Sequence, residues 1–281
     1  MNQPYACSSR NIPLPIKREV RQRCGFGCVV CDLPLYEYEH MEEWAVVQRH
    51  VSDEITLLCN QHHGEKTRGL LPKKEVKRAN ANPYNLREGV SKPYALHFSG
   101  DEATVEIGGN RFTTGNNGRP FSMLPLVIDN TPIIAFSMEG NHLFLTLQVF
   151  DSFNRLLLQI IENQLVYSII PWDIELVARN LKLREAHREI LIEIEFLPPN
   201  KISVNRGRFL LNGVELLVRN NRVLLVNNAN IISGCEGRGA ATGLALGEYS
   251  LGLPSIFTMG TIERYKVDRE RALKFEKEYN I

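Results

Sequence analysis

Four side chains in the N-terminal third of the chain have the types and spacing of a zinc site. They form two short pairs, Cys28-x2-Cys31 and Cys59-x2-His62. A spacing of two residues lets both side chains of a pair reach one ion from a single turn, and sulfur and imidazole ligands suit tetrahedral zinc. We therefore expect Cys28, Cys31, Cys59 and His62 to hold one structural Zn²⁺.

A second set of polar side chains accompanies these pairs. Glu39 and His40 stand within the 27 residues that separate the pairs, and His63 follows the last ligand directly. Hydrolysis of a phosphodiester needs an activated water and a cation at the developing charge, which a histidine and a bound divalent ion can supply. The separation is longer than a simple zinc ribbon needs, so we expect a folded insert that presents these side chains.

The residues around the metal pairs predict the order strand, strand, helix. Residues 35–40 alternate as in a strand, which places Glu39 and His40 on opposite faces at its end. Residues 55–58 predict a second short strand. Residues 60–68 predict a helix, and Gly69 closes it.

Residues 15–24 predict a further short helix before the first metal pair. Pro15 lies in its first turn and Gly25 at its end. Its apolar stripe consists of Ile16, Val20 and Cys24, spaced by four. Cys24 is therefore better explained as a packed core thiol than as a fifth metal ligand.

A basic cluster follows the second metal pair. Six cations fall within thirteen residues, with Glu75 as the one acidic residue among them. Alone, such a run of charge is usually a solvated surface, but beside a metal site it favours contact with a phosphate backbone. The six cations are Lys66, Arg68, Lys73, Lys74, Lys77 and Arg78.

The stretch from Arg18 to Leu71 resembles the HNH endonuclease family, the zinc-stapled branch of the ββα-metal nucleases. The resemblance is carried by Cys28, Cys31, Glu39-His40, Cys59, His62-His63 and Lys66-Thr67. It implies that His40 is the general base that activates water, and that Glu39 and His63 hold a catalytic Mg²⁺ or Mn²⁺. The implied activity is hydrolysis of DNA, and defence against foreign DNA is an expectation from the resemblance alone.

Two positions depart from the family's pattern. His62 stands where the family usually has a fourth cysteine, and imidazole is an equally good zinc ligand. Glu54 stands at the position of the family's central asparagine. Glu54 could orient His40 as part of the catalytic set or join the catalytic ion, but its charge would favour protonated His40, a poorer base. His50 could also assist, although a lone histidine in a polar loop is more often a surface residue.

The departure at Glu54 leaves an alternative from another class of protein, a zinc-stapled nucleic-acid-binding module without cleavage. Composition does not decide between them.

The 281 residues, 43% hydrophobic and 23% charged, predict a globular chain of two domains. The metal-spaced cysteines, with no signal peptide and no apolar run of about 18 residues, favour a reducing cytoplasm and no membrane.

The expected organisation is α+β, with a nuclease domain over residues 1–78, a linker over 79–93 and an all-β domain over 94–281. The linker is rich in turn formers. Beyond it, apolar residues alternate in runs such as 190–196, and turn signals separate short strands. This pattern fits a sandwich, a barrel or a solenoid. From Asn200 onward the turns recur every seven or eight residues, which favours stacked rungs.

The β domain is larger than stability of the metal domain requires. We therefore expect it to recognise the target, sense a small-molecule or protein trigger, or assemble a homo-oligomer. A charged helix is predicted over residues 261–281, suited to docking on its own domain or on a second subunit. Trp172-Asp173 could belong to a binding surface, but a tryptophan before an alternating strand is more often core. DNA is the expected partner; RNA, the target sequence and the number of strands cut stay open.

Overall fold

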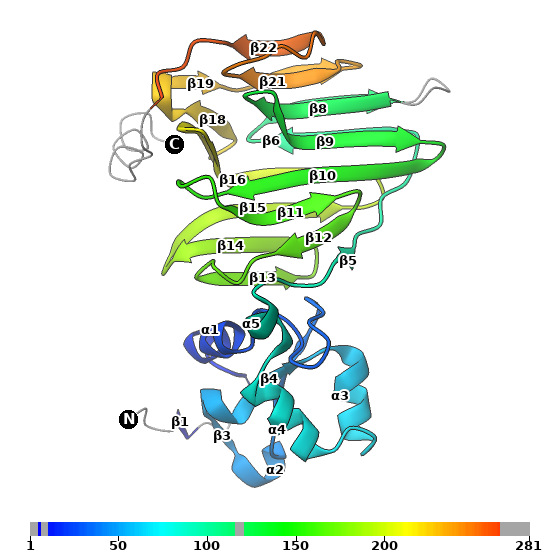
Figure 1. Ribbon diagram of the computed structural model, residues 1–281, viewed down its shortest axis with the longest axis vertical. Coiled ribbons are helices and arrows are strands. Elements are labelled where there is room, and N and C mark those ends of the chain that lie inside the picture. Colours follow the sequence, from blue (N-terminus) through cyan, green and yellow to red (C-terminus); the bar gives the residue numbers. More distant parts are fainter. Residues whose placement is uncertain (1–4, 7–10, 116–120, 265–281) are drawn as a thin grey trace.

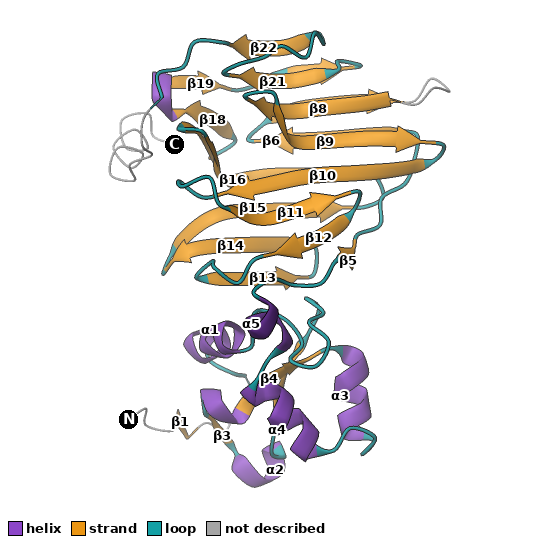
Figure 2. Ribbon diagram, viewed as in Figure 1, coloured by secondary structure: helices purple, strands orange, loops and turns teal. Residues whose placement is uncertain are grey.

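Two hydrophobic cores organise the chain. The computed structural model describes residues 5–6, 11–115 and 121–264. One core lies among residues 12–76, and the other draws on residues 98–262 together with Phe26. The helices gather around the first core, whereas the second lies between two large β-sheets (Figures 1 and 2).

The N-terminal part contains the expected strand, strand, helix order. Strand β2 pairs antiparallel with β4, and helix α3 follows directly. All four residues of β4 are buried, as its apolar run predicts. The elements of this part are β1 (Tyr5–Ala6), α1 (Leu14–Arg23), β2 (Glu37–His40), α2 (Trp44–Val47), β3 (Arg49–His50), β4 (Ile55–Leu58), α3 (Asn60–Thr67), α4 (Lys73–Ala81) and α5 (Tyr84–Glu88).

The segment 79–93, expected to be a linker, is largely folded. It holds the end of α4 and the whole of α5. Its turn formers mark helix ends instead of loose chain: Pro83 directly precedes α5, and Gly89, with φ of 76°, closes it. Asn85 is buried and donates a hydrogen bond of 2.7 Å to the carbonyl oxygen of Gly25. The segment therefore packs against the residues that lead into the first cysteine pair.

The remaining strands form two open sheets. One has the strand order β22 (Ser255–Met259), β21 (Thr242–Leu246), β8 (Phe121–Ile128), β9 (Thr131–Glu139), β10 (His142–Phe150), β11 (Leu156–Ile161), β12 (Gln164–Tyr167) and β5 (Tyr94–Ala95). The other runs β13 (Asp173–Val177), β14 (Asn180–Ala186), β15 (Glu189–Leu197), β16 (Lys201–Leu211), β17 (Val214–Arg219), β18 (Arg222–Leu225) and β19 (Asn230–Ile232). Strands β6 (Glu102–Ile107), β7 (Asn110–Gly115) and β20 (Glu236–Arg238) extend the second sheet from β16.

The two sheets face each other as a sandwich. Alternate residues of β10 and β15 are buried, as their period-two patterns predict. The ring of Phe98 lies between the sheets: its centroid is 5.6 Å from that of Phe136 on β9 and 6.4 Å from that of Phe196 on β15. Each large apolar side chain buried there contributes about 1.5–3 kcal/mol relative to its exposed state.

Between Lys201 and Ile232 the chain does not form the expected stacked rungs. Strands β16 to β19 pair antiparallel as successive hairpins. The reason lies in the turns, because Asn212-Gly213 and Asn220-Asn221 all adopt positive φ and reverse the chain within two residues. The recurrence of turns therefore reflects short hairpins.

Two further expectations concern the C-terminal helix and the membrane. Residues 265–281, most of the helix expected over 261–281, lie outside the described residues. Within the part of the chain that is described, no helix is both long and apolar enough to cross a membrane.

Candidate functional site

The four predicted zinc ligands converge on one point. Their ligand atoms all lie within 4.8 Å of one another. The Nδ1 atom of His62 is 3.4 Å from the Sγ of Cys28 and 3.2 Å from that of Cys59, and the Sγ atoms of Cys31 and Cys59 are 3.7 Å apart. A tetrahedron with zinc bond lengths of 2.0–2.3 Å has edges of about 3.3–3.8 Å between ligand atoms. The Cys28, Cys31, Cys59 and His62 cluster could therefore hold a zinc ion.

Backbone hydrogen bonds place these ligands. The amide of Val29 donates to the carbonyl of Leu57 on β4 at 3.0 Å, which ties the first cysteine pair to the strand that leads into the second. A hydrogen bond from the Cys31 thiol lowers the pKa of Cys28 below its usual value. Cys24 lies outside this cluster. It is buried beside Thr56, as expected for a core thiol.

Glu39 and His63 meet beside the zinc cluster. The His63 Nε2 atom is 2.9 Å from a Glu39 oxygen, and its Nδ1 atom is 3.5 Å from Glu37. Strand β2 brings both carboxylates to one face because they are two residues apart, and the first turn of α3 supplies the imidazole between them. The Lys66 ammonium also contacts Glu39, and it donates to the His40 carbonyl oxygen at 3.1 Å. Glu37 and the Lys66 contact were not predicted from sequence.

The His40 ring contacts a second histidine. Its Nε2 atom is 3.2 Å from the Nδ1 atom of His50. The His50 ring stacks on Trp44 with centroids 4.7 Å apart, and only 1% of the residue is exposed. Burial lowers the pKa of His40, and the neighbouring His50 lowers it further, so His40 is neutral near pH 7. His50, which was expected at the surface, is therefore buried against His40, the candidate general base.

The Glu54 carboxylate is engaged in an ion pair with a neighbouring arginine. Its carboxylate makes a bidentate ion pair with Arg49, with one contact of 3.0 Å. The backbone carbonyl of Glu54 accepts a hydrogen bond from Met41, which aligns the residues that follow β2. The two roles considered for this carboxylate, orienting His40 or binding the catalytic ion, thus compete with the Arg49 ion pair.

Four of the six clustered cations already have acidic partners. Lys66 pairs with Glu39, Lys73 with Glu42 and Glu43, Lys77 with Glu42, and Arg78 with Glu75. Arg68 and Lys74 form no ion pair with any described residue. The acidic residues 37–43 lie before the cations in sequence, so charge counting over residues 66–78 alone could not reveal this neutralisation.

A buried ion-pair network joins α1 and β2 to the second sheet. The Arg21 guanidinium donates two hydrogen bonds of 2.7 Å to Asp173 on β13 and a third of 2.7 Å to the Tyr38 hydroxyl on β2. Arg184 on β14 contacts Asp173 at 2.8 Å, and Glu175 lies 3.4 Å from Arg21. Asp173 is fully buried, so the Trp172-Asp173 pair contributes to an internal interface. No local sequence signal links residues 152 positions apart.

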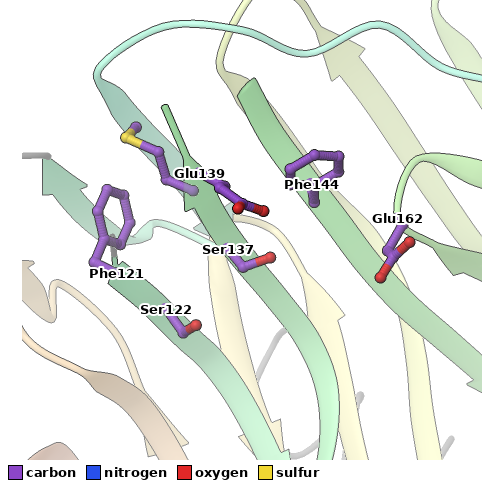
Figure 3. A pocket seen from close by; sticks show the side chains of 7 residues that line it. Phe121, Ser122, Ser137, Glu139, Phe144 and Glu162 are labelled. Carbon is purple, nitrogen blue, oxygen red and sulfur yellow. The ribbon is translucent and has the colours of Figure 1, made fainter. Parts of the chain in front are cut away.

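The first sheet, which contains β8, β9 and β10, carries a separate hollow on its outer face (Figure 3). It has a volume of about 460 Å³ and is lined by Phe121, Ser122, Ser137, Met138, Glu139, Phe144 and Glu162. Strands β8, β9 and β10 supply most of these side chains. None of them is a predicted site residue, so this hollow is distinct from the metal-binding region.

Comparison with family models, with curated proteins and with solved structures found no match.

Proposed function

We propose that this chain is a metal-dependent endonuclease of the HNH type that hydrolyses phosphodiester bonds of DNA. The observation that carries the proposal is the contact of 2.9 Å between Glu39 on β2 and His63 on α3, one residue from His40 and beside the Cys28, Cys31, Cys59 and His62 cluster. Glu39 and His63, of the types needed for ion binding, thereby meet, and His40, of the type needed for proton transfer, directly follows Glu39 in the chain.

The zinc cluster has a structural role in this proposal. Four protein ligands close a tetrahedral site and leave no position for substrate. The core around it is small and includes two of the ligands themselves, Cys28 and Cys59. Zinc would therefore fix β4 and the start of α3, and so the position of His63, without taking part in hydrolysis.

Glu39 and His63 would hold the catalytic Mg²⁺ or Mn²⁺. Two protein ligands suit Mg²⁺, which keeps several waters and binds proteins through few side chains. The Lys66 ammonium already occupies the Glu39 carboxylate, so an ion would compete with it there. When bound, the ion supplies charge stabilisation at the phosphate. Lys66 must then yield at least one contact with Glu39.

His40 would take the proton from the attacking water. Its lowered pKa keeps the imidazole unprotonated near neutral pH, which is the form a general base requires. The Glu54 carboxylate would have to leave Arg49 to orient His40 or to bind the ion.

Arg68 and Lys74 are the members of the basic cluster best suited to contact the nucleic-acid backbone. Both are exposed, and neither must first leave a carboxylate. The other four, Lys66, Lys73, Lys77 and Arg78, would have to exchange a protein partner for a phosphate. Such contacts are independent of sequence, so target choice would come from elsewhere in the chain.

The β-sandwich would supply that control, as a sensor, a recognition surface or an assembly surface. Support comes from Arg21, which contacts Asp173 in the second sheet and Tyr38 next to Glu39. A change at β13 could thereby reach the strand that carries the proposed site. Defence against foreign DNA, in the cytoplasm, remains part of this proposal.

The second candidate is a zinc-stapled nucleic-acid-binding module that does not cleave. The observation in its favour is that Lys66 already neutralises Glu39, the carboxylate that a catalytic ion would need.

The test is divalent-ion dependence of plasmid cleavage by the parent, a Glu39→Gln variant and a Glu139→Gln control from the exposed end of β9. We expect Mg²⁺ or Mn²⁺ to support cleavage by the parent and the control, and Glu39→Gln to lose it while keeping its zinc. Binding of DNA by the parent without cleavage in either ion would favour the second candidate.

A further inference from the structure

His50 occupies a position that its sequence context did not suggest. Strand β3 carries it back toward β2 after the turn at Gln48, which adopts a left-handed conformation with φ of 43°. This reversal places His50 beside His40, ten residues earlier. The imidazole is buried against the Trp44 ring, with an interplanar angle of 23°. Packing on Trp44 therefore helps to orient this ring.

The contact involves one specified nitrogen of each ring. The His40 Nε2 and His50 Nδ1 atoms are 3.2 Å apart, within hydrogen-bond range. In a pair of neutral imidazoles, one of these two atoms must carry the proton and the other must accept it. If His40 carries it on Nε2, its Nδ1 lone pair is left to accept a proton from water. If His50 donates instead, the lone pair of His40 Nε2 is consumed by the protein.

We propose that His50 is a positioning residue that accepts the Nε2 proton of His40 and thereby presents the Nδ1 atom of His40 as the base. The inference deepens the proposed nuclease function and, for its kinetic consequence, rests on it. Packing against Trp44 alone would need only an aromatic ring at position 50. Orientation of His40 needs an acceptor at the place of the His50 Nδ1 atom.

The first test reads the proton position without any cleavage. The full-length protein is labelled with ¹⁵N-histidine, and long-range ¹⁵N–¹H spectra are recorded at about pH 8, where exposed imidazoles are neutral. The His40 signals are assigned as those missing in His40→Ala. We expect Nε2 to be protonated and Nδ1 bare in the parent, and a mixture of both tautomers in His50→Phe. A His40 protonated on Nδ1 in the parent, or an unchanged His40 spectrum in His50→Phe, overturns the proposal.

The second test separates orientation from packing by two substitutions at position 50. His50→Phe keeps a ring that can stack on Trp44 but has no acceptor. His50→Asn loses the ring but places an amide oxygen near the former Nδ1 atom. Loss of an orienting partner of this kind typically costs about 10–100-fold. We expect that loss in kcat for His50→Phe, with KM unchanged because His50 is buried away from substrate, and substantial recovery in His50→Asn.

A failure of the positioning role of His50 can be told apart from a failure of the proposed nuclease function. A parent that cleaves no nucleic acid refutes the nuclease, whereas the tautomer of His40 is still decided by the spectra. Zinc content and circular dichroism check that both variants fold. Equal kcat values for His50→Phe and the parent contradict the positioning role, as does a His50→Asn variant that folds but is no more active than His50→Phe.

Discussion

Replacing Asp173 by asparagine should weaken the attachment of the metal-binding part to the β-sandwich. Asp173 accepts two hydrogen bonds from Arg21 and one from Arg184, and its side chain is fully buried. Only 6% of the Arg21 side chain is exposed, so solvent would compensate little for the lost charge. Asparagine keeps the shape but leaves buried guanidinium groups without their shared carboxylate.

The expected loss is about 3 kcal/mol. Removing one partner of a buried pair costs about 3–5 kcal/mol, because the other charge stays buried without compensation. The lower end applies here, since Glu175 lies 3.4 Å from Arg21 and also contacts Arg184. These two contacts of Glu175 still offset part of the buried positive charge of Arg21 and Arg184.

Urea unfolding followed by far-ultraviolet circular dichroism measures this loss. With a slope of about 3 kcal/mol/M, the midpoint should fall by about 1 M. Asp101→Asn is a matched control, because Asp101 is exposed and such surface changes are usually within about 0.5 kcal/mol. Equal midpoints for Asp173→Asn and the parent would refute the reasoning that this network holds the two parts together.

Three further predictions address the metal, the pH dependence and the phosphate contacts. Removing zinc with a chelator, or replacing Cys59 by alanine, should unfold the metal-binding part while the sheets persist. Near-ultraviolet circular dichroism together with zinc analysis checks this. A Cys235→Ala control should behave as the parent. Burial alone would raise the pKa of Glu175, but Arg184 and Arg21 hold it below the usual value. The ionised Glu175 carboxylate therefore stabilises the fold at pH values above its unfolded-state pKa. The difference in unfolding free energy between the parent and Glu175→Gln should be constant above about pH 5. It should shrink as the pH falls through the folded-state pKa of Glu175. If Arg68 and Lys74 contact phosphates, their double replacement by alanine should reduce the slope of log binding constant against log salt concentration by nearly two. The same replacements at Lys73 and Lys77, which pair with Glu42, should reduce it less; equal slopes would contradict the distinction.

Local spacing predicted the parts of the site that lie within one turn or one strand. The Cys28 and Cys59 pairs needed only a two-residue separation, and β4 and α3 needed only their apolar and capping patterns. Alternation likewise predicted the buried faces of β10 and β15. These features are determined by neighbours a few residues away.

The features missed depend on how distant segments meet. His50 reaches His40 only because Gln48 turns the chain, and Arg21 meets Asp173 across 152 positions. The hairpin turns after Asn200 required the sign of φ as well as the spacing of turn residues. In segment 79–93, the proline and glycine that predict turns instead start and end a helix.

The central claim is that His40 is the base of a metal-dependent nuclease. The most direct measurement compares plasmid cleavage in Mg²⁺ by the parent, by His40→Ala and by His97→Ala, an exposed histidine outside the site. Zinc content is determined for all three proteins, because His40 is not a member of the zinc cluster. The account predicts that His40→Ala keeps its zinc and loses about 10²–10⁴-fold in rate, whereas His97→Ala matches the parent. Cleavage by His40→Ala at the rate of the parent would contradict it.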